Sequence, residues 1–112
     1  MSVVNEEYID VDDALKRIGG NRDLYKRLLQ RFLEGKQLEE LDAALEKGDA
    51  DEASRAAHTI KGVAANLSLV KLRTISTDLE MIIKEDLEYG EKLDELKEAY
   101  DETVKMIAVI LS

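Results

Sequence analysis

No proline occurs at any of the 112 positions, and this absence limits the possible folds more than any other feature of the sequence. Proline ends or kinks a helix because it lacks a backbone N–H and its ring clashes with the preceding turn. Helix-favouring Leu, Ala, Glu and Lys are frequent, whereas the aromatic residues that strands favour are few, with four Tyr and one Phe. We therefore predict an all-α protein in which residues 1–112 form one domain around a single core.

Residues that suit the ends of helices divide the chain into five predicted helices. Asp, Asn and Ser favour helix starts because their side-chain oxygens accept hydrogen bonds from free backbone N–H groups, and Gly often follows the last turn. The predicted helices are Val11–Ile18 between Asp10 and Gly19–Gly20, a helix from Asn21 toward Lys47 and Gly48, a third after Asp49 with Glu52 completing a near capping box, a fourth from Ser68 to near Gly90, and a fifth from about Glu91 to the C-terminus.

The last two predicted helices carry apolar residues at helical spacing. The two stripes are Leu72, Ile75, Leu79, Ile82, Ile83 and Leu87, and then Leu93, Leu96, Tyr100, Val104, Ile107 and Leu111. Such stripes bury one side of each helix against its neighbours, and short turns make consecutive helices antiparallel. The sequence therefore predicts an antiparallel four-helix bundle with a short additional N-terminal helix.

The second predicted helix has two apolar faces, one on each side of Gly35. The first comprises Tyr25, Leu28, Leu29 and Phe32, and the second comprises Leu38, Leu41 and Leu45. Either the helix bends at the glycine, or its halves face different neighbours. We favour the second interpretation, with the later half in the bundle and the first half against the short opening helix. That packing either leaves apolar surface for a partner or simply completes the core.

Charge and composition exclude several classes of function. The formal net charge of −9 disfavours binding to nucleic acids and to anionic membranes, although an acidic surface also simply keeps a protein soluble. No apolar run approaches the roughly 20 residues that span a bilayer, and the acidic N-terminus does not resemble a signal peptide. The chain has no cysteine, which excludes disulfides and thiolate metal sites. We expect a cytoplasmic protein.

The single histidine, His58, is predicted to lie on the outer face of the third helix. At about 100° per residue, one face of that helix collects the core candidates Ala53, Ala56, Ile60, Val63, Ala64 and Leu67. The opposite face, around His58, collects Asp51, Ser54, Arg55, Lys61, Gly62 and Ala65. The imidazole is therefore expected to point away from the core.

The residues one and two turns after His58 suit a phosphorylated imidazole. Gly62 opens space beside the ring at a mid-helix position where glycine costs about 1 kcal/mol relative to alanine. Lys61 supplies a positive charge where an anionic group on the ring would lie, and Ala65 keeps the next turn low. Neutral imidazole is a competent nucleophile at cellular pH, and phosphoryl transfer depends mainly on positioning and charge neutralisation. No Gly-rich phosphate loop is present, so no ATP-dependent kinase activity is expected.

The run from His58 to Ser68, HTIKGVAANLS, resembles the motif of histidine-containing phosphotransfer domains, His-x-Leu-Lys-Gly-x-Ser/Ala-x-x-Leu/Ile-Gly. The resemblance extends over nearly the whole chain. The opening Leu15, Gly19-Gly20-Asn21, Leu24-Tyr25, Leu28-Leu29 and Phe32-Leu33 looks like the start of such domains, and Leu79-Glu80 looks like the family's Leu-Glu pair. Two residues depart from the motif. Ile60 replaces a core leucine, and Ser68 replaces the glycine that ends the helix, which costs about 1 kcal/mol if the position needs positive φ unless the serine caps the next helix.

The resemblance implies a role for each matching residue. His58 would accept the phosphoryl group, Lys61 would be its charge partner, and Gly62 would provide clearance. Glu80 would hydrogen-bond the ring's Nδ1 and leave Nε2 free to attack, or it is an ordinary carboxylate on the flank of its helix.

The same resemblance implies the partners. These would be response-regulator receiver domains and a sensor or hybrid histidine kinase, with the receiver supplying aspartate and a divalent metal, so that the chain itself needs no cofactor. A receiver would dock over the His58 face and the second helix. The candidate contacts are Ser54, Arg55, Ala65, Asn66 and Leu28. The simplest expectation is a monomer.

Two other functions are conceivable for a helical bundle with this sequence. A module that binds a receiver or another helical partner without phosphorylation would show the same stripes and charge, but it would not depend on His58. A di-iron enzyme of the four-helix type needs two Glu-x-x-His pairs, which one histidine cannot supply. The sequence leaves open the direction of transfer, the cognate proteins, and whether the chain is free-standing or a module of a larger kinase.

Overall fold

The computed structural model describes residues 4–112, and this part of the chain contains six helices and no strand. The helices are α1 (Val11–Arg17), α2 (Arg22–Glu34), α3 (Gln37–Lys47), α4 (Ala50–Leu67), α5 (Val70–Lys84) and α6 (Gly90–Leu111). The predicted all-α class is confirmed. None of the helices in the described range is long and apolar enough to cross a membrane.

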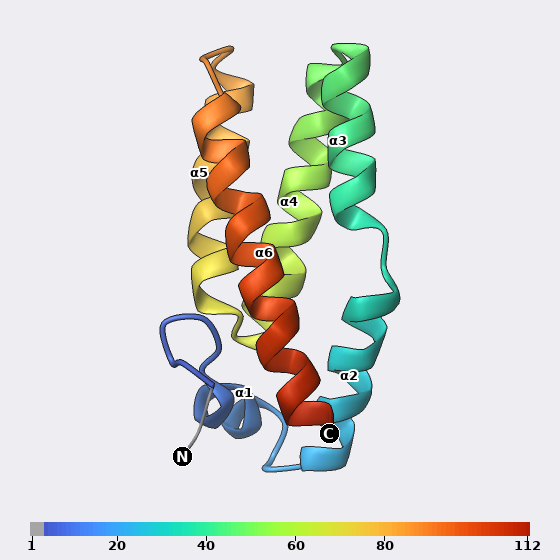
Figure 1. Cartoon of the computed structure of the whole chain (residues 1–112), viewed down its shortest axis with the longest axis vertical. Coiled ribbons are helices and arrows are strands. Elements are labelled where there is room, and N and C mark those ends of the chain that lie inside the picture. The colour runs from blue at the N-terminus through green and yellow to red at the C-terminus, as the bar shows by residue number, and fades with distance from the viewer. Residues whose placement is uncertain (1–3) are drawn as a thin grey trace.

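Helices α3, α4, α5 and α6 run along the long axis of the molecule (Figure 1), which measures 41 × 23 × 20 Å. Helix α4 contacts α3 on one side and α5 on the other, and α5 also contacts α6. Helices α1 and α2 close one end, where α2 contacts α1, α4 and α6. Among these pairs, the most extensive contact is between α4 and α5, the helices that carry His58 and Glu80.

The core is built from one apolar side chain per turn on each helix. Burying these side chains supplies the main favourable free energy of folding, roughly 1.5 to 3 kcal/mol for each large residue. The fully buried large apolar residues are Ile9, Leu29, Leu41, Ile60, Leu69, Leu72, Leu79, Leu96 and Ile107. Seven of them lie in α2 to α6, whereas Ile9 and Leu69 lie just before α1 and α5, and α1 contributes the buried Ala14 and Leu15.

Three of the predicted N-caps are confirmed. The side chains of Asp10, Asn21 and Asp49 each accept a hydrogen bond of 3.0 Å from the backbone N–H three residues later. Each bond satisfies one of the free N–H groups in the first turn of a helix. The start of α1, α2 and α4 is thus determined locally by the sequence.

The predicted single helix from Asn21 toward Lys47 is wrong, because the chain leaves helical geometry at Gly35 and Lys36. Gly35 is extended, with φ −73° and ψ 159°, and the side chain of Gln37 occupies the space that a Cβ on Gly35 would fill. The Gln37 amide also donates a 3.4 Å hydrogen bond to the carbonyl of Phe32, at the end of α2. The break lets α3 pack along α4 while α2 packs at the closed end, as the two apolar faces indicated.

The predicted capping role of Ser68 is also wrong. Ser68 ends α4 in the left-handed region, with φ 56°, and Leu69 precedes α5 without a side-chain cap. The hydroxyl of Ser68 instead donates a 2.7 Å hydrogen bond to Asp13 of α1. The position does need positive φ, and a contact with a third helix offsets the strain that serine suffers there.

Helix α5 ends at Lys84 and not near the predicted Gly90. Asp86 adopts a left-handed conformation with φ 57°, and the backbone N–H of Leu87 donates to the carbonyl of Ile82 at 3.0 Å, which closes the helix. Leu87 lies beyond this turn and is 55% exposed, so the last residue of the expected stripe does not join the core.

Candidate functional site

His58 lies on the face of α4 that points away from the core, as the helical periodicity predicted. Its side chain is 65% exposed, whereas Ala57, Ile60 and Ala64 on the same helix are fully buried. The ring is therefore accessible to solvent while the helix that carries it is held firmly by packing.

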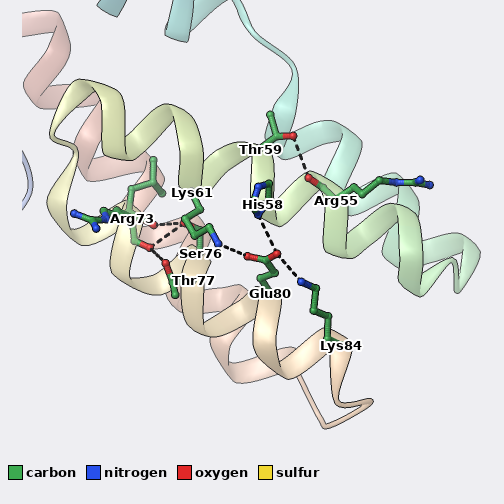
Figure 2. Close-up of polar contacts among 10 residues, drawn as sticks. Arg55, His58, Thr59, Lys61, Arg73, Ser76, Thr77, Glu80 and Lys84 are labelled. Atoms are coloured by element: carbon green, nitrogen blue, oxygen red, sulfur yellow. Dashed lines mark hydrogen bonds and ion pairs between the residues drawn. The ribbon is translucent and has the colours of Figure 1, made fainter.

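Glu80 of α5 lies directly beside the ring and is almost fully buried, with 7% of its side chain exposed. Figure 2 shows three donors that converge on its carboxylate. His58 Nδ1 lies 3.1 Å from Oε2, Lys84 Nζ lies 3.0 Å from the same oxygen, and Lys61 Nζ lies 2.8 Å from Oε1. The suggested contact between Glu80 and Nδ1 is thus present in the structure.

The two lysines keep Glu80 ionised despite its burial. Burial alone would raise the pKa of this carboxyl, but hydrogen bonds and charge from Lys61 and Lys84 lower it from 4.5 to about 2. An ionised carboxylate only accepts hydrogen bonds, so the 3.1 Å contact requires the proton of the neutral ring to be on Nδ1. The lone pair is then on Nε2, on the far side of the ring from Glu80.

Gly62 leaves open space one turn after His58. A Cβ built on Gly62 would meet no atom within 4 Å, so packing within the protein does not require glycine there. Since glycine in a helix interior costs about 1 kcal/mol, the vacant surface is a feature that the fold alone does not explain. Space for a bulky group on or near the imidazole is an explanation that the geometry permits.

Two of the five candidate partner contacts line the same groove, and the other three do not. Leu28 of α2 and Asn66 of α4 line one groove of about 480 Å³, together with Val63 of α4. Arg55 is exposed but extends away from Glu80 in Figure 2, and the carbonyl of the half-buried Ala65 accepts a 2.7 Å hydrogen bond from Arg17.

Ser54 is a correction to the expected contact surface. It lies on the His58 side of the helical wheel, but only 7% of the residue is exposed. Its side chain lines a shallow pocket with Arg55 and Lys84 and offers little area to a partner.

Sequence reasoning missed Lys84. The signal was present, because Glu80 and Lys84 are four residues apart on one helix, a spacing that favours an ion pair. What the spacing did not reveal is that this pair shares an oxygen with the histidine of a different helix. Within residues 4–112, no group of three or more His, Cys, Asp or Glu side chains is placed to hold a metal ion.

Comparison with known proteins gives one match. The family model of the Hpt domain matches residues 27–105, which include most of α2 and α6 and the whole of α3, α4 and α5. No curated protein and no solved structure matches the chain. The matched segment holds His58, Glu80 and both lysines and covers well over half of the chain, so the protein belongs to the Hpt domain family.

Proposed function

We propose that this protein is a phosphorelay intermediate, in which Nε2 of His58 accepts a phosphoryl group from the aspartate of one receiver domain and passes it to another. Hpt domains are phosphocarrier modules of two-component signalling and are not kinases. One observation carries the assignment to His58: the buried, ionised Glu80 lies 3.1 Å from Nδ1 of an exposed ring, which directs the lone pair of Nε2 outward.

The proposed step needs no proton transfer. The Nε2 lone pair attacks phosphorus, the N–P bond forms, and the O–P bond of the partner's aspartyl phosphate breaks to release a carboxylate. The ring keeps its Nδ1 proton and gains one positive charge, which the Glu80 carboxylate stabilises. Glu80 would act as the carboxylate of a catalytic triad does, because it fixes the tautomer of the imidazole and stabilises the positive charge that develops on it.

Lys61 and Gly62 suit the product of this step. A phosphoryl group on Nε2 brings negative charge to a site where one carboxylate already faces two ammonium groups, so the local charge stays nearly balanced. Lys61 is the candidate charge partner, and the open space beside Gly62 provides room for the group or for the partner that delivers it. Phosphoryl transfer needs little more from the carrier than this positioning.

A receiver would dock beside the His58 face, on the groove that Leu28 and Asn66 line. The receiver would supply the aspartate and the divalent metal. The scaffold that we propose is an antiparallel four-helix bundle in which α2 and α3 share one corner, acting as a monomer in the cytoplasm. The short turns and the side-by-side helices of Figure 1 support this arrangement.

The test is the intact mass of the protein after incubation with phosphoramidate or with a phosphorylated receiver. Wild type should gain one acid-labile phosphoryl group, and His58→Gln should gain none, because the chain contains no other histidine. Glu80→Gln is the matched variant that keeps His58 but removes the carboxylate, and its phosphorylation rate should fall about tenfold to a hundredfold.

The alternative is a docking module that binds a receiver without being phosphorylated. A folded wild-type protein that gains no adduct from several donors, and a His58→Gln variant that binds the receiver as wild type does, would favour that alternative and refute the carrier function.

A further inference from the structure

The two oxygens of the Glu80 carboxylate have different partners. Oε1 accepts one hydrogen bond, from Lys61 at 2.8 Å. Oε2 accepts from two groups, His58 Nδ1 at 3.1 Å and Lys84 Nζ at 3.0 Å. The distances show that the ammonium of Lys84 and the imidazole share one acceptor atom. Any change at Lys84 therefore acts on the same oxygen that holds the ring.

Because Lys84 shares Oε2, the hydrogen bond between the carboxylate and the imidazole is weaker. A positive charge 3.0 Å from Oε2 draws electron density toward itself, so Oε2 is a poorer acceptor for Nδ1–H. The developing positive charge on the ring during attack by Nε2 is then less well stabilised. Lys84 thus opposes the effect of Glu80, whereas the effect of Lys61 reaches the ring only through the opposite oxygen.

The two lysines also differ in freedom. The side chain of Lys61 is 29% exposed, and that of Lys84 is 62% exposed. Lys84 lines a shallow pocket with Arg55 and with Asp51, a second carboxylate on the side of α4 that precedes His58. A lysine that is mostly exposed to solvent is more easily drawn away from Glu80 by another anion, whereas Lys61 is held more closely against it.

We propose that Lys84 is a positioning residue that restrains the nucleophilicity of His58 by competing with Nδ1–H for Oε2 of Glu80. This inference rests on the proposed function, because it concerns the reactivity of the same imidazole. Release of Lys84 strengthens the Glu80–His58 hydrogen bond and makes Nε2 more reactive. A docked partner with an acidic residue at the pocket of Lys84 and Arg55 would have this effect.

The experiment compares wild type with Lys84→Met, which keeps the apolar stem and removes the ammonium group. The rate of phosphorylation by phosphoramidate is measured from pH 5 to pH 9. We expect a plateau rate about twofold to fivefold above wild type, as a modest change in one charged hydrogen bond implies. We also expect the pH of half-maximal rate to rise, because removing the ammonium group leaves the Glu80 carboxylate freer to stabilise a positive charge on the ring.

Two further variants keep the test specific. Lys84→Arg restores a cation and should return the profile toward that of wild type. Lys92→Met removes a lysine that pairs with Glu95 at 2.8 Å on α6, and it should leave the profile unchanged. A Lys84→Met protein that reacts more slowly than wild type, or with an unaltered pH profile, would overturn the proposal.

A double-mutant cycle decides whether Lys84 acts through Glu80. In a Glu80→Gln background, Lys84→Met should have no further effect on the rate, since the shared oxygen no longer carries the charge. An effect of the same size in both backgrounds would show that Lys84 acts on the phosphoryl donor directly, and the inference would be wrong.

Nitrogen NMR of the imidazole separates failure of this inference from failure of the carrier function. In the unphosphorylated protein above pH 8, Lys84→Met should shift the Nδ1 signal in the direction of a stronger Nδ1–H hydrogen bond to Glu80. If that shift occurs but wild type is not phosphorylated, the proposed function is refuted while the effect of Lys84 on the ring stands. Normal phosphorylation without the shift would refute the role of Lys84 alone.

Discussion

Helix α5 pairs with α4 on one side and with α6 on the other, and different interactions hold the two pairings in place. Ser68, in the turn that leads from α4, is 6% exposed and is bonded to the N-terminal segment at two points. Its hydroxyl donates to Asp13 at 2.7 Å, and its carbonyl accepts from the N–H of Asp10 at 3.0 Å. The next residue, Leu69, is fully buried.

The turn that leads from α5 to α6 has the same left-handed backbone conformation, but its hydrogen bonds go only to nearby residues. Asp86 has φ 57°, close to the 56° of Ser68, but it is exposed, and its backbone N–H bonds only to the nearby Ile83 carbonyl at 3.1 Å. Across this pairing, Lys92 and Asp78 form an ion pair of 3.8 Å at the surface. Leu87, the counterpart of Leu69, is 55% exposed.

The difference follows from what each pairing must align. The His58–Glu80 hydrogen bond and the Lys61–Glu80 ion pair both cross from α4 to α5, so a small slide between these helices would break them. A turn held by a third segment of the chain resists such a slide. Helices α5 and α6 share no buried ion pair among the residues described, so their pairing has no such contact to align.

Truncation of the two leucines gives the largest contrast. Leu69→Ala should lower the free energy of unfolding by roughly 2 to 5 kcal/mol, because it leaves a cavity in the core. Leu87→Ala should change it by less than about 0.5 kcal/mol, since the side chain is mainly in water. Chemical denaturation of both variants measures the difference, and equal losses would show that the two turns are anchored alike.

Acid should weaken the α4–α5 pairing more than the α5–α6 pairing. The folded pKa of Glu80, about 2, lies below its usual 4.5, so its ion pairs stabilise the fold above pH 4.5 and lose this effect as the pH falls toward 2. We expect the free energy of unfolding of wild type to exceed that of Glu80→Gln by roughly 2 to 3 kcal/mol at pH 7 and by about half of that at pH 3.

Asp78→Asn is the matched control for the acid experiment, because it removes a surface carboxylate from the other pairing. Its free energy of unfolding should differ from that of wild type by less than about 0.5 kcal/mol at either pH. A difference between wild type and Glu80→Gln that does not shrink on acidification would contradict the assignment of an ionised, lysine-bound Glu80.

Replacing the two left-handed residues by glycine gives the smallest contrast. Asp86→Gly should raise the free energy of unfolding by about 0.5 to 1 kcal/mol, because glycine adopts positive φ without strain. Ser68→Gly gains the same relief but loses the hydrogen bond to Asp13, so its net effect should be close to zero. Thermal unfolding of the pair checks this, and a clear gain for Ser68→Gly would mean that the bond to Asp13 contributes little.

Much of the fold follows from short-range patterns. The caps at Asp10, Asn21 and Asp49 and the outward direction of His58 were predicted correctly, because capping and helical periodicity depend on neighbours a few residues away. The continuous second helix was a wrong prediction, because the break at Gly35 depends on where α2 and α3 find partners. The early end of α5 was missed for a similar reason, since an aspartate in the left-handed region gives a weak sequence signal.

The residues alone indicate the helical class, the exposed histidine and the family resemblance that suggested Glu80 as its partner. The packing of the helices is needed to see that Lys84 shares an oxygen with His58 and that Ser68 bonds to Asp13 instead of capping α5. Periodicity tells which face a side chain occupies, but the choice of one acceptor atom depends on how far α4 has slid along α5. That register is set by contacts between residues up to 55 positions apart, which no local pattern encodes.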